Sequence, residues 1–320
     1  MCSSDLTLER PHDGPVAASV RALASSASAE PQIARSGAES TVCSDAPVPT
    51  CYDSRVITAG AQPVTGVAVA GQELFWLEGS QVMSLNANGT HLALDAHTTG
   101  RRLSGLVLDR SYRSTGFVFV GEVVVDKEGA ETFSVVRYRN AEGALGERAT
   151  MVTGLPVTSV APVFTLDTQG RIYVATPGAP DSRDYYSGRL LRFSNNGSTP
   201  RDNPAMSPVI SDGLTRPSGV LVAQGDEAVV TGRREDGVAT ALRLRISPVG
   251  DDAPTGVTVT GDGGVGTFVA SANGLTWIDQ MHWAQEDVTA VTSSGTDLYV
   301  ATVSKADGSG ILRRLRPIHP

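Results

Sequence analysis

A unit of three short apolar strands recurs along the chain from residue 55 onward, and this repetition limits the fold more than any other feature. Each unit has an apolar strand, a turn rich in Gly or Asp, a strand of the type Leu-Tyr-Val-Ala, a variable loop, and a strand with Arg or Ser between apolar residues. Such self-similarity is typical of β-propellers, in which each unit forms one blade and stacking covers the faces of the sheets. The sequence therefore predicts an all-β protein built as a β-propeller.

The number of blades follows from the number of copies. Clear copies occupy 66–85, 105–138, 163–193, 219–245 and 288–315. A degenerate copy near residues 257–286 brings the prediction to six four-stranded blades, with five as the alternative. The last clear copy shows three strands, so we expect residues 55–58 to supply its outer strand and to close the ring.

The N-terminal part of the chain differs in composition. Residues 1–54 are rich in Ala, Ser, Pro and Glu, and their apolar residues follow no sustained period, which is typical of a leader or linker. We therefore assign residues 1–54 to a disordered leader, which includes a possible signal remnant, and residues 55–320 to the propeller domain. No stretch approaches 18 consecutive apolar residues, so no transmembrane segment is expected.

Several features favour an exported bacterial protein. Residues 22–29 end in an A-x-A pattern like a signal-peptidase site. Cys43 and Cys51 lie close together in a polar segment without zinc-type partners, which favours a local disulfide, with two unpaired thiols as the alternative. Lys127 and Lys305 are the two lysines beside abundant Arg, Ala and Val, a composition typical of GC-rich bacterial genes. We expect a periplasmic or secreted monomer.

Charge and missing fingerprints exclude several functions. The formal net charge is −8 and the arginines are scattered rather than gathered in a stripe, so nucleic acid is not an expected partner. The G-x-S-x-G elbow, the P-loop and the Rossmann fingerprint are all missing from the sequence. Conventional hydrolase, kinase and nicotinamide-dependent activities therefore have no support.

Three segments between residues 104 and 222 match known motifs. Residues 104–120 resemble "GLALDPDF…NGYVYV", residues 168–175 resemble "PDGRLYVAT", and residues 187–204 resemble "GKILRI…DGSIPADNP". These are motifs of the soluble quinoprotein glucose/sorbosone dehydrogenases (aldose sugar dehydrogenases), so the chain resembles that family. The resemblance implies a β-propeller, oxidation of a sugar C1 hydroxyl, and pyrroloquinoline quinone (PQQ) with calcium as cofactors.

The resemblance also implies a general-base histidine just before residues 168–175. That position falls near Ser159, within residues 158–162, and the sequence has no histidine between His97 and His282. Hydroxyl and aliphatic side chains do not titrate near neutral pH, so they cannot take up the proton. The active site is therefore expected to be degenerate, and whether the protein is an enzyme stays open.

The cofactor landmarks also differ from the family pattern. The "GHRNPQG" segment corresponds to residues 213–219, in which Arg216 is one position off and is the candidate ligand of the PQQ carboxylates; a structural or solvated arginine is the alternative. The calcium turn corresponds to residues 232–237, whose basic side chains are poor ligands for a hard cation.

Isolated residues supply further weak candidates. His282 beside Trp283 is the candidate for a displaced base, with a packed or surface residue as the alternative. Asp251 and Asp252 are the candidate cation ligands, with an ordinary turn as the alternative. A polar loop follows the central strand of the third copy and is a candidate binding loop or a solvated one. It contains Asp181, Asp184, Tyr185 and Tyr186.

Three functions remain after these observations. The first is an exported, noncatalytic or degenerate sugar-dehydrogenase-like propeller that binds a small molecule, glycan or protein on its central face. The alternative is an active PQQ-dependent aldose sugar dehydrogenase with a displaced base. The third is an interaction domain, for which the basic stretch at residues 313–316 is the motivation.

Overall fold

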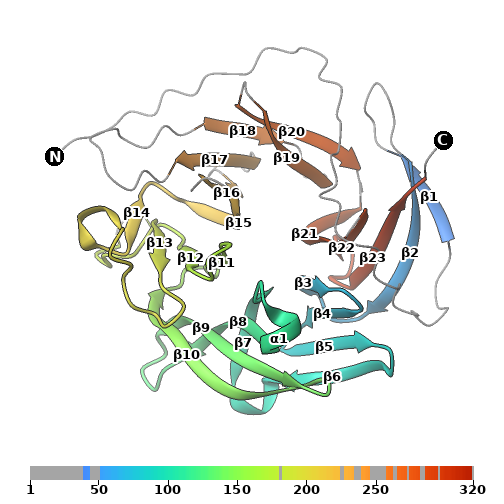
Figure 1. The fold of residues 1–320 in the computed structure, drawn as a ribbon, viewed down its shortest axis with the longest axis horizontal. Helices are drawn as coiled ribbons and strands as arrows, with labels where there is room; N and C mark the ends of the chain where they lie inside the picture. The colour runs from blue at the N-terminus through green and yellow to red at the C-terminus, as the bar shows by residue number, and fades with distance from the viewer. Residues whose placement is uncertain are drawn as a thin grey trace. The chain divides into compact units, whose positions relative to one another are not determined.

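The computed structural model describes most of the chain from residue 39 onward. The described residues are 39–43, 51–179, 182–223, 227–233, 239–245, 257–261, 265–271, 274–281, 285–294 and 296–318. Within them, 23 β-strands are accompanied by one four-residue α-helix and two short 3₁₀ helices. The strands form six sheets (Figure 1). This content confirms the predicted all-β class.

The chain divides into two compact units, which are described separately. Of the described residues, one unit holds those within 155–262 and 267–278, and the other holds those within 39–154, 263–266 and 279–320. In most of the sheets, strands that follow one another along the chain pair side by side. This up-and-down order is that of a propeller blade.

Two sheets of the unit that begins at residue 39 have four strands each. Their orders are β3-β4-β5-β6 and β10-β9-β8-β7. The helix α1 (Tyr112–Thr115) connects β7 to β8, and the 3₁₀ helix η1 (His97–Thr99) precedes β7. The strands are β3 (Val64–Ala70), β4 (Glu73–Glu78), β5 (Gln81–Asn86), β6 (Gly89–Asp95), β7 (Arg101–Leu108), β8 (Phe117–Val125), β9 (Glu131–Ala141) and β10 (Ala144–Pro156).

The third sheet of this unit joins segments from the two ends of the described chain. Its order is β1-β2-β23-β22-β21. Strand β2 pairs antiparallel with β23, and Arg55 lies opposite Arg314. This pairing confirms that residues 55–58 supply the outer strand of the last copy. The strands are β1 (Glu39–Cys43), β2 (Cys51–Gly60), β21 (Glu286–Ser294), β22 (Asp297–Ser304) and β23 (Gly310–Pro317).

Strand β4 shows why the central strands have nearly continuous apolar sequences. Phe75 and Leu77 belong to a core cluster with residues of β7, β8 and β9, whereas Leu74 and Trp76 belong to a cluster with residues of β22 and β23. All four side chains are at most 2% exposed. Because alternate residues of a strand face opposite sides, a strand covered on both faces must be apolar at every position.

The β-structure begins before residue 55. Strand β1 and the first residues of β2 fall within the segment that composition assigns to a leader. Tyr52 is 3% exposed and packs with Val300 and Leu315, and the expected disulfide joins Cys43 to Cys51. A boundary at residue 54 therefore cuts through β2, because pairing with β23 is a tertiary contact that composition does not reveal. The rest of the assigned leader lies outside the described residues.

The unit that begins at residue 155 contains two four-stranded sheets, β11-β12-β13-β14 and β15-β16-β17-β18. A core cluster that includes Tyr173, Leu190, Leu214 and Val230 lies between them. The 3₁₀ helix η2 (Pro204–Met206) precedes β14. The strands are β11 (Val163–Leu166), β12 (Ile172–Ala175), β13 (Leu190–Phe193), β14 (Val209–Ser211), β15 (Arg216–Ala223), β16 (Glu227–Arg233), β17 (Ala239–Arg245) and β18 (Val257–Gly261).

The degenerate copy corresponds to two elements of the structure. Its first strand, β18, completes the sheet of β15, whereas β19 (Val265–Ser271) and β20 (Gly274–Met281) form a two-stranded sheet. Against the prediction of six four-stranded blades, the described residues form four sheets of four strands, one of five and one of two. The predicted β-propeller architecture is confirmed.

In the described part of the chain, no helix is long and apolar enough to cross a bilayer.

Candidate functional site

Several of the candidate residues named from the sequence fall on or beside three connections of the unit that begins at residue 155. These are residues 157–162 between β10 and β11, 176–189 between β12 and β13, and 212–215 between β14 and β15. In an up-and-down sheet, the connection from the second to the third strand leaves from the same end as the connection to the next sheet. These segments therefore gather at one end of their sheets.

The second and third of these connections are in direct contact. The Gly178 amide donates to the Thr215 carbonyl (3.0 Å), and the Leu214 amide donates to the Gly188 carbonyl (3.0 Å). A Cβ atom added to Gly178 would lie 2.5 Å from the Leu214 carbonyl oxygen, closer than packing permits. Leu214 itself is buried in the core beneath the loops. A glycine and an apolar anchor thus hold the two loops together.

The β12–β13 loop carries most of the polar side chains. Its ends are joined by Thr176, whose hydroxyl donates to the Tyr186 carbonyl and accepts from the Arg189 amide (3.0 Å). Asp184 accepts the Tyr186 amide (2.8 Å) within the loop. The Tyr185 side chain is 61% exposed, and its ring lies 5.8 Å from the Arg189 guanidinium. The loop is internally braced while it presents an aromatic ring to solvent.

An ion pair also connects this loop to the β14–β15 connection. The Arg189 Nη1 atom lies 3.0 Å from the Asp212 carboxylate, whose side chain is 76% exposed. The pair could not be read from the sequence, because the two residues are 23 positions apart and Asp212 lies outside the motifs, although Arg189 lies within the 187–204 segment. Asp181, which the sequence grouped with this loop, lies outside the described residues.

Arg216 is the first residue of β15 and is exposed. Its backbone lies opposite Arg233 of β16. Its guanidinium forms no ion pair with any residue that the structure describes. An unpaired cation at the start of an inner strand can accept an anionic or hydroxylated ligand, as the sequence analysis suggested. The structure places it next to the β14–β15 connection.

Hydroxyl side chains stand where the resemblance implies a base. The Thr158 hydroxyl interacts with the amide and carbonyl of Val160, at 3.3 and 3.4 Å, so its hydrogen-bonding capacity is used within its own turn. Ser159 is exposed. Neither group titrates near neutral pH. The other candidates, His282, Asp251 and Asp252, lie outside the described residues.

These side chains do not fit a bound PQQ with calcium. The quinone carries several carboxylates, whereas the described residues at this end of the sheet offer the guanidiniums of Arg183 and Arg216 outside ion pairs with described residues. Calcium takes six to eight oxygen ligands, and no group of three or more His, Cys, Asp or Glu side chains arranged to hold a metal occurs among the described residues. No catalytic step through PQQ is derived for this chain.

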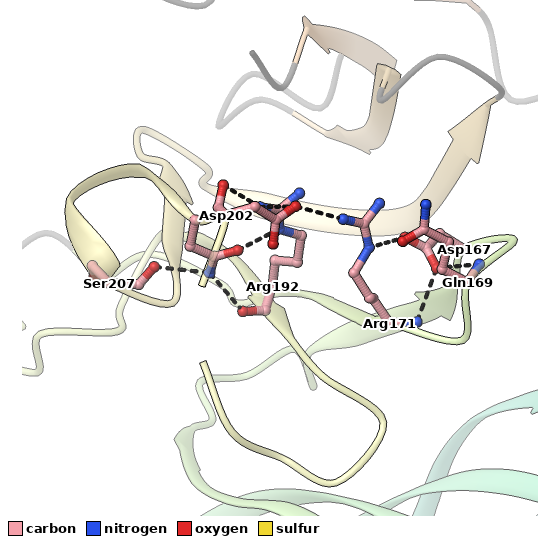
Figure 2. A network of polar contacts seen from close by, with 7 residues as sticks. Asp167, Gln169, Arg171, Arg192, Asp202 and Ser207 are labelled. Carbon is pink, nitrogen blue, oxygen red and sulfur yellow. Dashed lines mark hydrogen bonds and ion pairs between the residues drawn. The ribbon is translucent and has the colours of Figure 1, made fainter. Parts of the chain in front are cut away.

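A buried network occupies the opposite end of the β11-β12-β13-β14 sheet, and most of its residues belong to the motifs that carry the resemblance (Figure 2). Arg192 is 1% exposed, and its guanidinium donates to the Asn203 side chain and to the Asp202 carbonyl (2.9 Å). The Asn203 amide donates in turn to the carbonyls of Arg192 (3.0 Å) and Ser207 (2.8 Å). The network closes the long loop between β13 and β14.

A second arginine extends this network. Arg171 bridges the Asp167 carboxylate and the Asp202 carboxylate, the latter at 2.9 Å. Burial raises the pKa of the neighbouring Tyr173, although the nearby guanidiniums of Arg192 and Arg171 oppose the shift. Since the arginine, asparagine and aspartate side chains hold one another and the loop backbone, the most specific motif of the sequence stabilises the fold.

Comparisons with known proteins support the fold. No family model matches the chain, and no curated protein matches it. Among solved structures, the PQQ-bound aldose sugar dehydrogenase of Streptomyces coelicolor is 16% identical, with 83% of this chain and 98% of that chain covered and a TM-score of 0.62. The apo form of the soluble aldose sugar dehydrogenase of Escherichia coli is 13% identical, with 83% and 100% covered and a TM-score of 0.66.

A third similar structure is the oxidoreductase (glucose dehydrogenase) of Thermus thermophilus. It is 14% identical, with 82% of this chain and 99% of that chain covered and a TM-score of 0.63. At such identities the likeness establishes the fold, and activity depends on individual side chains. The chain therefore has the β-propeller fold of the soluble aldose and glucose dehydrogenases.

Proposed function

We propose that this protein is an exported, sugar-dehydrogenase-like β-propeller that binds a glycan and does not oxidise it. The observation that carries the proposal is the turn at Thr158 and Ser159, where a hydroxyl engaged within its own turn and an exposed serine occupy the place of the base. Without a group that titrates near neutral pH, the C1 hydroxyl of a bound sugar has no proton acceptor there.

The loops at this end of the sheet suit a carbohydrate better than a protein or an apolar small molecule. The exposed Tyr185 ring can stack on the C–H face of a pyranose, as amphipathic aromatic side chains do at wet interfaces. The Arg189–Asp212 pair and Arg216 offer donors and acceptors for hydroxyl groups. The braced β12–β13 loop limits the entropy that binding would cost.

Export is supported by the Cys43–Cys51 disulfide, because disulfides persist mainly in oxidising compartments.

The interaction-domain alternative has less support. Within the basic stretch, Arg313 pairs with Glu286 at 2.6 Å, and Arg314 and Arg316 lie within 3.3 Å of Asp297. These carboxylates neutralise the positive charge that motivated the alternative.

A second candidate is an active PQQ-dependent aldose sugar dehydrogenase with a displaced base. The likeness of the fold to the PQQ-bound Streptomyces coelicolor enzyme favours it. In this candidate His282 would act as the base and Arg216 would hold the quinone carboxylates, so the candidate requires a base outside the described residues.

One experiment separates the two candidates. Purified protein is mixed with PQQ and calcium, and its thermal stability and its reduction of a dye are measured with a panel of aldoses. Sugar-dependent dye reduction that is lost in His282→Ala would refute the proposal and establish the alternative. We expect no thermal shift with PQQ and calcium and no turnover of any aldose. We also expect saturable binding to a glycan array, and this binding should be lost in Tyr185→Ala.

A further inference from the structure

A polar cleft lies in the unit that begins at residue 39, apart from the loops considered so far. It has a volume of about 590 Å³ and is bordered by the β3–β4 turn, helix α1 and the β9–β10 turn. The β3–β4 and β9–β10 turns lie at the end of their sheets opposite to the connections that lead to the next sheet. The side chains that matter are Gln72, Glu73, Tyr112, Arg113, Arg139 and Asn140.

The floor of the cleft is a preorganised hydrogen-bond network. The Tyr112 hydroxyl donates to the Glu73 carboxylate, and the Asn140 amide donates to the same carboxylate (3.1 Å) and to the Tyr112 oxygen (2.6 Å). The Asn140 side-chain oxygen accepts the Gly143 amide (3.0 Å), which fixes its orientation. Burial, and then the hydrogen bond to Glu73, raise the pKa of Tyr112, so the phenol stays a donor.

The wall of the cleft carries unpaired positive charge. Arg113 is exposed, and its guanidinium forms no ion pair with any residue in the described part of the chain. Gly71 has a φ of +64°, and a Cβ atom there would lie 2.6 Å from the Arg113 Nη2 atom, so the glycine makes room for the guanidinium. Arg139 borders the same cleft and forms an exposed ion pair with Glu147, in which Nη1 lies 3.6 Å from Oε2.

A second hollow adjoins the first. It has a volume of about 610 Å³ and shares Ala70, Tyr112, Arg113 and Ser114 with the cleft. Arg113 therefore borders both hollows. A ligand longer than one sugar ring can contact it from either side.

We propose that this cleft binds an acidic saccharide through a carboxylate that pairs with Arg113. A guanidinium binds a carboxylate through two parallel hydrogen bonds. The Glu73 carboxylate and the amides of Gln72 and Asn140 are suited to sugar hydroxyls, which both donate and accept. A neutral sugar has no carboxylate to pair with Arg113, and a simple anion has no hydroxyl group to donate to Glu73. Uronic acids combine both kinds of group.

The test uses the full chain and three probes: glucuronate, glucose and acetate, titrated separately by calorimetry. We expect saturable binding of glucuronate in the millimolar range or tighter, with glucose and acetate each at least tenfold weaker. Equal affinity for acetate would overturn the saccharide assignment, because it would show an anion site alone. Equal affinity for glucose, or no saturable binding of glucuronate, would overturn the proposal outright.

Substitutions test whether glucuronate binds in the cleft. Arg113→Ala is expected to weaken glucuronate binding about tenfold or more, since a hydrogen-bonded charge is lost, with unchanged thermal stability. Arg102→Ala is the matched control, because Arg102 is 51% exposed, lies on β7, the strand before α1, and does not border the cleft. Equal effects of the two variants would refute the assignment. Arg216→Ala should leave this binding unchanged, which separates it from the glycan site proposed above.

Discussion

The guanidinium of Arg192 lies 3.3 Å from the carboxylate of Asp202, with 2% of the arginine side chain and 49% of the aspartate side chain exposed. The buried guanidinium is therefore held mainly by the Asn203 side chain and by the Asp202 carbonyl oxygen. This asymmetry decides which member of the network matters for stability, because an exposed partner can turn to water when its companion is removed.

Arg192→Ala is expected to lower the free energy of unfolding by about 2–4 kcal/mol, since it opens a cavity and leaves the buried Asn203 without its partner. Asp202→Asn is expected to cost less than about 1 kcal/mol, because that carboxylate is half exposed. Urea unfolding followed by tryptophan fluorescence measures both. Similar losses for the two variants would contradict the asymmetry.

The loop contact at Gly178 leads to a second prediction. Gly178→Ala is expected to destabilise the protein by about 1–3 kcal/mol, because the new methyl group would meet the Leu214 carbonyl oxygen and backbone cannot move aside cheaply. Gly146→Ala is the matched control, since a Cβ atom there has no neighbour within 4 Å. The comparison uses the thermal midpoint of each variant, and equal midpoints for the two would show that the loops do not pack this closely.

The environment of Glu286 predicts that the free energy of unfolding falls at acid pH. Burial raises the pKa of this carboxyl, but hydrogen bonds from Arg313 and Thr302 outweigh burial, so its pKa lies below the usual value. The folded state thus binds the proton more weakly than the unfolded state, whose glutamate has a pKa of about 4.3. The stabilisation is complete well above that pH and is lost as the pH falls through the folded-state pKa.

The measurement is the free energy of unfolding between neutral pH and pH 3 for the native protein and Glu286→Gln. The native protein is expected to be the more stable at neutral pH, with a difference that narrows as the solution is acidified. A constant difference over that range would show that the carboxylate charge does not contribute. Asp287→Asn serves as a control, because the Asp287 side chain is 56% exposed.

Arg216 is expected to matter for binding and not for folding. Arg216→Ala should change the free energy of unfolding by less than about 0.5 kcal/mol, as is usual for an exposed position. The same substitution should lower the affinity for the glycan that contacts Tyr185 several-fold, as measured by calorimetric titration. A large loss of stability would identify Arg216 as a structural residue, which is the alternative that its sequence context allowed.

Much of the candidate site could be read from the sequence because it depends on which residue occupies a motif position. The sequence alone shows that Thr158 and Ser159, which carry hydroxyl groups, occupy the position where a base is expected. The Arg189–Asp212 pair and the Glu73–Tyr112–Asn140 network could not be foreseen in this way. Glu73 and Asn140 are 67 residues apart and lie in different sheets, so their meeting depends on packing.

The sequence by itself determined the all-β class, the blade-like repeats and the closing role of residues 55–58, because strand periodicity and apolar runs are local properties. Only the tertiary structure decided that β1 and residues 51–54 join the last sheet, that Gly178 seals two loops, and that a polar cleft forms beside α1. Each of these depends on contacts between segments far apart in the chain. Their free energy comes from pairing and burial that no local pattern records.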